Sequence, residues 1–327
     1  MVNSLHIGES IEDFLLYLDG LRYSSNTIKG YQFDLQGFSL FIMKRNESPI
    51  IEFKKFERFL LSYINSLRVY DDDKEYEIST MNRKRACFRK YIKFLYKWEH
   101  IPLDFSHKIE SMKNKKNPNK DILNPEELSK VKNYLSSITH SRFSSQKKQL
   151  KQVRNRFVFY SLLYSGMRVS ELTNLKWKHI NITESVITVE EGKGNKNRTI
   201  PIHEDLFHEY ELYKTTLLSI WGENHPIFSG YLLPRNERNP NIPLTTKTIR
   251  LIIRTIIEES MILEKHISPH NLRHTFASYS VLNNISIPVL SSILGHSKKS
   301  ITMDVYAHVI DDKQKEIELK KLSFSSG

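Results

Sequence analysis

Apolar residues recur at helical spacing in four stretches of the first hundred residues. Intervals of three, four and seven place each set on one face of a helix. The four sets are Ile11, Phe14, Leu15, Leu18; Ile28, Tyr31, Leu35, Phe38, Ile42; Phe56, Phe59, Leu60, Tyr63; and Phe88, Tyr91, Leu95. This pattern predicts a small all-helical bundle, in which Ser24, Ser25 or Asn26 caps the second helix and Ser79 or Thr80 caps the fourth.

After residue 120 the pattern predicts helices together with one β-hairpin. Asn124 followed by Pro125 has the composition of a helix start, and Gly166 is expected to end a later helix. The polar segment from Ser141 to Gln152 predicts a basic surface loop or a frayed helix end. The remaining expected elements are a hairpin of 186–190 with 198–202, and helices near 245–260, 270–283, 287–294 and 300–307.

A basic segment separates these two parts of the chain. Residues 107–120 contain almost nothing apolar and carry five lysines among asparagines and a proline. This composition predicts a linker between a domain of residues 1–106 and a domain of residues 121–327, whose tail is 311–327. A linker that crosses a DNA backbone and a plain flexible tether explain this composition equally well.

The charge of the chain favours a polyanionic partner. The 49 Lys and Arg residues exceed the 37 Asp and Glu residues by 12, which favours nucleic acid first and an anionic membrane surface second. No apolar run is long enough to span a bilayer and no signal peptide is visible, so we expect a cytoplasmic protein. The single cysteine, Cys87, excludes an intrachain disulfide and is expected to be a half-buried thiol.

Positive charge is concentrated on the fourth predicted helix and on the linker. A solvated helix face would explain these residues, but the net charge of the chain favours contact with phosphate groups. The candidates for DNA contact in this region are Arg83, Arg85, Arg89, Lys90, Lys113, Lys115 and Lys116.

Cations also stand at three expected helix starts, where the helix dipole disfavours them. Arg168 follows the helix break at Gly166, and His270 and Arg273 lie in the first turn of a helix that Ser268 is expected to cap. His296 follows a third break. Such placement is expected where an anion such as a phosphate binds among N–H donors.

Each of these signals has an ordinary alternative. Arg168 could form an ion pair with Glu171, and Tyr306 could be a core aromatic residue. His270 and His274 have the spacing of a metal pair, but the motif lacks the glutamate of a zinc site, so no metal is expected. Only the joint occurrence of the signals, in this order, favours an active site.

Together the motifs resemble the tyrosine recombinase (phage integrase) family. They are SGMRVSEL, GKGNKNRTIPI, SPHNLRHTFAS, LSSILGHS and MDVYAHV, which contain Arg168, Lys193, His270 with Arg273, His296 and Tyr306. The resemblance covers residues 121–310 motif by motif and the first domain in general pattern only. It implies a mainly α-helical protein with a small β-hairpin or sheet in the second domain. It also implies a C-shaped clamp, in which a helical core-binding domain and a catalytic domain lie on opposite sides of the duplex.

The resemblance implies a chemistry for the six residues. Tyr306 would attack a backbone phosphate to leave a 3′-phosphotyrosyl bond, while Arg168 and Arg273 would offset the charge at phosphorus. His270 and His296 would add donors. Lys193 would protonate the departing 5′-oxygen, although Lys196 lies on the same turn and remains an alternative.

The resemblance also implies partners. These are double-stranded recombination sites in the nucleoid, further copies of the chain in a dimer or tetramer, and accessory DNA-bending proteins; no cofactor is implied. Further candidates for DNA contact are Lys196, Arg198, Lys247 and Arg250.

The interval of ten residues between His296 and Tyr306 resembles integrases of mobile elements rather than chromosome-dimer resolvases of the Xer type. The rival interpretations are a DNA-binding regulator without strand transfer and a type IB topoisomerase.

Overall fold

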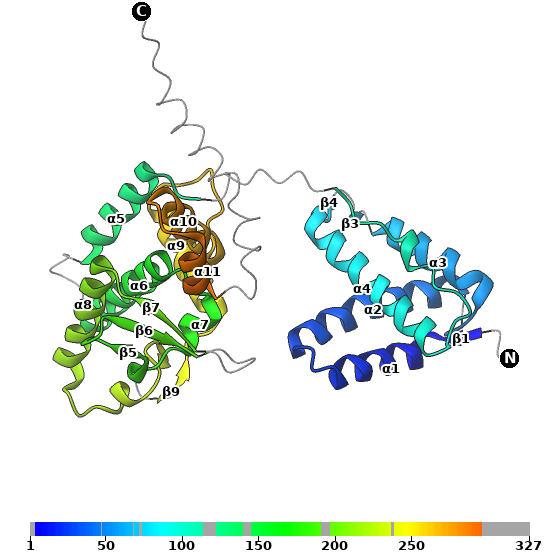
Figure 1. Cartoon of the computed structure of the whole chain (residues 1–327), viewed down its shortest axis with the longest axis horizontal. Helices are drawn as coiled ribbons and strands as arrows, with labels where there is room; N and C mark the ends of the chain where they lie inside the picture. Colours follow the sequence, from blue (N-terminus) through cyan, green and yellow to red (C-terminus); the bar gives the residue numbers. More distant parts are fainter. Residues whose placement is uncertain are drawn as a thin grey trace, which may run out of the picture. The chain divides into compact units, whose positions relative to one another are not determined.

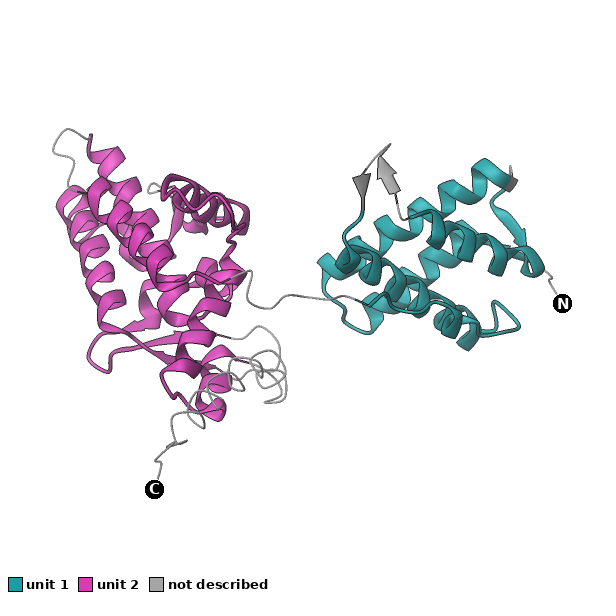
Figure 2. Cartoon of the chain, turned by 90° about the horizontal axis from the view of Figure 1, so that it is seen from above, with its two compact units in different colours: residues 1–116 teal, residues 117–327 magenta. Residues whose placement is uncertain are grey.

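The computed structural model describes residues 4–46, 48–67, 69–71, 74–113, 122–139, 145–190, 197–236 and 239–295. The chain divides into two compact units, residues 1–116 and residues 117–327, which Figure 2 colours teal and magenta. The division falls inside the basic segment 107–120, while the domain limits at 106 and 121 stay predictions. No helix in the described ranges is long and apolar enough to cross a membrane.

Unit 1 is built on four helices, as the apolar spacing predicts (Figure 1). They are α1 (Ile7–Gly20), α2 (Ser25–Asn46), α3 (Phe53–Ser66) and α4 (Ile78–Lys97). Two antiparallel strand pairs accompany them, β1 (Ser4–His6) with β2 (Ile50–Glu52) and β3 (Val69–Asp71) with β4 (Lys74–Glu75). The all-helical prediction is corrected on this point, because strands of two or three residues are too short to show an alternating pattern.

One of the two predicted helix caps in unit 1 is confirmed and the other is wrong. Ser24 caps α2, since its Oγ accepts a hydrogen bond from the N–H of Thr27 at 3.2 Å. The predicted cap of α4 at Ser79 or Thr80 is wrong. That helix already begins at Ile78, with Glu77 before it and no side-chain hydrogen bond in the cap position. A serine or threonine near a predicted helix start can therefore lie inside the first turn of the helix instead of at its N-cap.

The core of unit 1 is rich in aromatic residues. Phe38 and Phe88 are fully buried and meet edge to face, with ring centroids 5.9 Å apart. Cys87 lies in the same core with 0% exposure, which corrects the expectation of a half-buried thiol. Burial raises the pKa of this thiol far above its ordinary value, so Cys87 is a small apolar core residue.

The segment after α4 folds back onto that helix. Ile109 is buried in the core of unit 1. Asn82 on α4 accepts a hydrogen bond from the N–H of Met112 at 2.7 Å and donates one to its carbonyl at 2.9 Å. The described beginning of the segment 107–120 is therefore attached to unit 1, because Ile109 and Met112 provide apolar anchors that its overall composition obscures.

Unit 2 combines seven described helices with two small antiparallel sheets. The helices are α5 (Pro125–Thr139), α6 (Gln146–Ser165), α7 (Val169–Asn174), α8 (Glu204–Trp221), α9 (Thr246–Glu259), α10 (Pro269–Leu282) and α11 (Ile287–Leu294). One sheet has the order β5 (Ile180–Asn181), β6 (Val186–Val189), β7 (Arg198–Pro201), and the other pairs β8 (Pro234–Asn236) with β9 (Asn239–Pro243). A mainly helical fold with a small sheet in the second unit agrees with the prediction.

Helix α6 lies at the centre of unit 2, where it contacts α5, α7, α8, α9 and α10 (Figure 1). Residues 156–163 are all buried, so the second half of the helix is covered on every side, while its first turn is exposed. It begins at Gln146, which corrects the prediction of a loop or frayed end for residues 146–152, while 141–144 lie outside the described residues. Lysines near its start mask the periodicity there, although Leu150 and Val153 are buried.

The local predictions for unit 2 otherwise agree closely with the structure. Asn124 accepts from the N–H of Glu127 at 2.8 Å, and Glu127 accepts from the N–H of Asn124 at 2.7 Å, which forms a capping box at α5. The hairpin β6–β7 and the helices α9, α10 and α11 lie where they were expected. The predicted helix at 300–307 lies outside the described residues.

Candidate active site

The first predicted arginine lies directly after the central helix. Gly166 ends α6 with a φ of 61°, the left-handed conformation that glycine adopts without strain. Arg168 then occupies the N-cap position of α7 with extended backbone angles. Its side chain is 43% exposed, so the turn at Gly166 presents a guanidinium group at the surface of unit 2.

The second predicted arginine is buried close to this turn. Ser268 and Pro269 begin α10 as predicted. Arg273 is the fifth residue of the helix, in the second turn rather than the predicted first, and only 4% of its surface is exposed. Its Nη1 donates to the carbonyl of Gly166 at 2.6 Å, and its Nη2 donates to the carbonyl of Leu294 at 2.7 Å. Arg273 thus ties the end of α6 to the end of α11.

The end of α11 is held by three arginines from three different elements. Arg198 on β7 donates from Nε to the carbonyl of Ile293 at 2.8 Å, Arg273 donates to Leu294, and Arg168 donates from Nη2 to Gly295 at 3.0 Å. These consecutive carbonyls at a helix C-terminus lack helical partners and carry partial negative charge, which favours cations there. We call this arrangement the arginine clamp. It fixes the backbone immediately before His296.

Glu171 connects two members of the arginine clamp. Its carboxylate accepts from the N–H of Arg168 at 2.6 Å, from Nη1 of Arg168 at 2.8 Å and from Nη2 of Arg198 at 2.7 Å. Burial opposes ionisation of Glu171, but the hydrogen bonds from Arg198 and Arg168 outweigh it and hold its pKa below the ordinary value. Sequence reasoning offered Glu171 only as an ordinary ion-pair partner of Arg168, and Arg198 only as a DNA contact.

His270 lies on the exposed side of α10, one turn from His274. The two Nε2 atoms are 3.0 Å apart, so one ring donates and the other accepts. Two imidazolium rings cannot form this hydrogen bond, because both nitrogens of a charged ring are donors. At least one of the two rings is therefore neutral. Among the described residues, no group of three or more His, Cys, Asp or Glu side chains has the arrangement of a metal site.

Four other predicted residues of the site lie outside the described residues. They are Lys193, Lys196, His296 and Tyr306. The structure describes the strands on both sides of the lysine turn, up to Glu190 on one side and from Asn197 on the other. It also describes the chain up to Gly295. The described structure therefore brings Arg168, Arg273 and Arg198 together next to the point where His296 follows.

The DNA-contact candidates of α4 are engaged within unit 1. Arg83 forms two hydrogen bonds with the buried carboxylate of Asp34, which also accepts from Lys84. Arg85 donates to the carbonyl of Glu110 at 2.7 Å, and Arg89 donates to that of Ile109 at 2.6 Å. These contacts hold the segment after α4 in place, and they account for much of the charge on this helix.

The remaining DNA-contact candidates differ in exposure. The Nζ of Lys90 lies 4.8 Å from the centre of the Tyr23 ring, and Lys113 is exposed. Lys247 and Arg250 are exposed in the first turns of α9. By contrast, the Arg198 side chain is 8% exposed and donates to Glu171 and to the carbonyl of Ile293. Lys115 and Lys116 lie outside the described residues.

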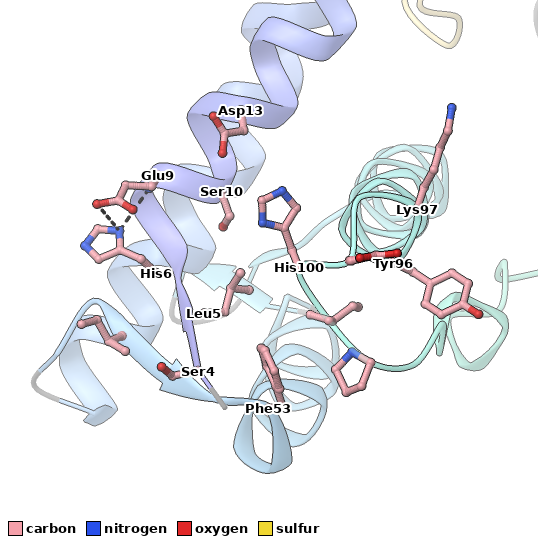
Figure 3. A pocket seen from close by; sticks show the side chains of 14 residues that line it. Ser4, Leu5, His6, Glu9, Ser10, Asp13, Phe53, Tyr96, Lys97 and His100 are labelled. Carbon is pink, nitrogen blue, oxygen red and sulfur yellow. Dashed lines mark hydrogen bonds and ion pairs between the residues drawn. The ribbon is translucent and has the colours of Figure 1, made fainter. Parts of the chain in front are cut away.

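A large cavity in unit 1 is separate from these predicted residues. It has a volume of about 1080 Å³, and Figure 3 shows side chains from α1 and from the segment after α4 around it. Its lining combines the carboxylates Glu9, Asp13 and Glu99 with His6 and His100. Figure 3 marks the contacts of His6 with Glu9. This mixed charge does not match a polyanion.

Comparison with known proteins places these observations in a family. Residues 132–313, more than half of the chain, match the Phage integrase family. The chain is 28% identical over 313 residues to Tyrosine recombinase XerA of Pyrococcus horikoshii, covering 95% of this chain and 93% of that protein.

Two solved structures are similar in fold. The XerH site-specific recombinase in a post-cleavage complex with a palindromic difH substrate matches with a TM-score of 0.64 at 20% identity, covering 89% of this chain and 78% of that one. The lambda integrase tetramer bound to a Holliday junction also has a TM-score of 0.64, at 16% identity, covering 93% of this chain and 78% of that one. At these identities the likeness concerns the fold.

Proposed function

The chain belongs to the phage integrase family, and we propose that it is a site-specific recombinase that cuts and rejoins DNA through Tyr306. The observation that carries the proposal is the arginine clamp. It assembles Arg168 and Arg273, which are 105 residues apart, at the backbone that leads to His296. A site with two guanidinium groups is suited to a phosphate whose negative charge increases during the reaction.

The proposed reaction begins with attack on a backbone phosphate. The Tyr306 oxygen bonds to phosphorus while the bond from phosphorus to the 5′-oxygen breaks, which leaves a 3′-phosphotyrosyl bond and a free 5′-hydroxyl. Arg168 and Arg273 donate to the non-bridging oxygens, and His296 adds a donor. His270 accepts the tyrosine proton. The exposure of His270 at the first turn of α10 supports this role, because its ring is accessible to a substrate and a neutral imidazole has a nitrogen able to accept a proton.

The departing 5′-oxygen needs a proton of its own. We assign this proton to Lys193 on the turn between β6 and β7, with Lys196 as the alternative on the same turn. The 5′-hydroxyl formed in this way can then attack the phosphotyrosyl bond in the reverse direction, returning its proton to the lysine while the Tyr306 oxygen regains a proton from His270. Because the covalent bond conserves the energy of the cleaved phosphodiester, rejoining requires no ATP, and the arginines offset the charge that a metal ion would otherwise neutralise.

The proposed partners are double-stranded recombination sites and further copies of this chain. The lambda integrase neighbour is a tetramer on a Holliday junction, which supports assembly of several protomers on DNA. We further propose that accessory DNA-bending proteins assist and that the protein acts in the nucleoid. For the tail 311–327, docking on a neighbouring protomer and packing on its own protomer agree equally well with the sequence. The ten-residue interval between His296 and Tyr306 supports a mobile element as its source.

The test is the capture of a covalent adduct from a pool of DNA. The protein is incubated in EDTA with sheared DNA from the source organism that carries random nicks, and protein-linked DNA is recovered under denaturing conditions and sequenced. We expect an enriched sequence with the wild type and with the control Tyr134→Phe, and none with Tyr306→Phe. Equal recovery from all variants would overturn the proposal. Relaxation of any supercoiled plasmid without an enriched sequence would favour a type IB topoisomerase.

A further inference from the structure

Arg198 supports the groups that hold the Arg168 guanidinium. Among the described residues, Arg168 donates from Nη1 to Glu171 at 2.8 Å and from Nη2 to the carbonyl of Gly295 at 3.0 Å. Arg198 donates to the same carboxylate and to the carbonyl of Ile293, two residues before Gly295. The contacts therefore form a closed ring, from Arg198 through Glu171 and Arg168 to the end of α11 and back to Arg198.

Both oxygens of Glu171 are shared between the two arginines. Oε1 accepts from Nη1 of Arg168 at 2.8 Å and from Nη1 of Arg198 at 3.1 Å. Oε2 accepts from the main-chain N–H of Arg168 at 2.6 Å and from Nη2 of Arg198 at 2.7 Å. The planar fork of Arg198 thus fixes the carboxylate, and the carboxylate fixes both the backbone and the side chain of Arg168.

Arg198 also changes the charge that this group of residues carries. A carboxylate paired with Arg168 alone would cancel its formal charge, whereas two guanidinium groups and one carboxylate together have a formal charge of +1. The side chains of Arg198 and Glu171 are only 8% and 11% exposed, so solvent screens their interaction weakly. The positive charge is therefore kept at the exposed member of the group, which is Arg168.

The sheet of unit 2 gives Arg198 a fixed origin. It is the first residue of β7 and pairs with Val189, the last residue of β6. Val189 is 2% exposed and belongs to the core of unit 2, and β7 also contacts α11. A side chain that starts from a packed strand can hold the neighbouring α7 and the end of α11 in a constant relation.

We infer that Arg198 is a positioning residue for strand cleavage, which holds Arg168 in place to contact the phosphate that is cut. The inference rests on the proposed function for the identity of the reaction. Arg198 acts through Glu171 and through the end of α11, and not through a contact of its own with DNA. Because a misplacement of about 1 Å can cost about 10² in rate, loss of this support slows cleavage even though Arg168 is still present.

Arg156 offers a matched control in the same unit. Its guanidinium forms a fork with Glu209 on α8 and donates to the carbonyl of Leu135 on α5 at 3.5 Å, and its side chain is 10% exposed. The burial and the types of partner are therefore those of Arg198, but Arg156 lies outside the arginine clamp. Arg156→Gln should lower the melting temperature as Arg198→Gln does, because each leaves a buried carboxylate without its arginine. It should not change the rate of cleavage by folded molecules.

The test is a double-mutant cycle on the rate of adduct formation. Each protein is mixed in saturating excess with the DNA sequence enriched in the adduct capture, so the rate constant does not depend on the number of active molecules. We expect Arg198→Gln to slow the reaction by about 10² and Arg168→Gln by about 10²–10³. The double variant should be no slower than Arg168→Gln alone, because the two residues act as one unit. Arg198→Lys, which keeps the charge without the fork, should react faster than Arg198→Gln and more slowly than the wild type.

Equal rates for Arg198→Gln and Arg156→Gln would overturn the inference, because Arg198 would then only stabilise the fold. Losses that multiply in the double variant would also overturn it, since Arg198 would then act independently of Arg168, as a direct DNA contact does. If Arg198→Gln does not fold, the cycle is made with Arg198→Lys, and Arg156→Lys is its control. Either contrary result with a normal wild-type adduct would leave the proposed function standing, whereas the absence of a wild-type adduct would overturn the proposed function and this inference with it.

Discussion

Arg168 and Arg273 donate hydrogen bonds to consecutive carbonyls, those of Gly295 and Leu294, at the end of α11. Their own elements are also tied together, because Arg273 donates to the carbonyl of Gly166 two residues before Arg168. The two guanidinium groups are therefore fixed relative to each other and to the backbone before His296. Such fixed donors need little reorganisation when charge develops at a phosphate.

Replacement of Arg168 by glutamine tests its contribution to the reaction. We expect Arg168→Gln to slow adduct formation by about 10²–10³, because one charged donor to the phosphate is lost. The melting temperature should change little, since the side chain is 43% exposed. Lys214→Gln serves as the control for loss of one positive charge and should retain the wild-type rate. A wild-type rate for Arg168→Gln would show that this arginine does not contact the reacting phosphate.

The turn at Gly166 should tolerate no side chain. A Cβ atom there would lie 2.8 Å from Cε1 of Phe276 and 3.0 Å from Cδ2 of Leu294, and the backbone has a positive φ. We expect Gly166→Ala to lower the free energy of unfolding by more than about 2 kcal/mol, from strain and overpacking together. Gly20 at the end of α1 is the control, because open space surrounds it and its φ is not positive.

In urea denaturation, Gly20→Ala should change the free energy of unfolding by no more than about 1 kcal/mol. Equal losses for the two variants would mean that packing against Phe276 and Leu294 does not constrain the turn.

The depressed pKa of Glu171 predicts a pH-dependent contribution to stability. Ionised Glu171 stabilises the folded state above its ordinary pKa of 4.5, and this contribution is lost as the pH falls from 4.5 through the lower folded value. Glu171→Gln should therefore be less stable than the wild type by about 3 kcal/mol at pH 7. The difference in melting temperature between Glu171→Gln and the wild type should become smaller below pH 4.5.

The control for this experiment is Glu126→Gln, which removes an exposed carboxylate from the first turn of α5. Its melting temperature should stay close to that of the wild type at both pH values. If the melting temperatures of Glu171→Gln and the wild type differed by the same amount at pH 4 and pH 7, this result would contradict an ionised Glu171 that bridges Arg168 and Arg198.

The choice between Lys193 and Lys196 can be made with an altered leaving group. Once the cut site is mapped, a substrate with sulfur in place of the bridging 5′-oxygen can be used, since a thiolate departs without a proton. We expect Lys193→Ala to slow cleavage of the oxygen substrate by about 10²–10⁴ and to cleave the sulfur substrate normally. Lys196→Ala should cleave both. If the sulfur substrate restored normal cleavage to Lys196→Ala instead, Lys196 would be the general acid. If it restored cleavage to neither variant, a lysine general acid would be refuted.

Local signals were sufficient to predict most helix boundaries around the site. Asn124 with Pro125, Gly166, and Ser268 with Pro269 act within one turn of the chain, so their effect could be predicted without tertiary structure. The arginine clamp could not be predicted in this way, because its contacts join residues 21 to 127 positions apart. Arg198 shows the difference most clearly. Its positive charge predicted a contact with DNA, but its hydrogen-bond partners are Glu171 and the carbonyl of Ile293.

The chemical identity of the protein–DNA bond tests the central claim most directly. The adduct is formed in EDTA, digested with nuclease and protease, and the linked peptide is sequenced by mass spectrometry while the ends of the released strand are labelled. We expect a nucleotide joined through its 3′-phosphate to Tyr306, and a released strand with a free 5′-hydroxyl. A bond to another residue, a bond through a 5′-phosphate, or an adduct that forms only with added divalent metal would contradict this claim.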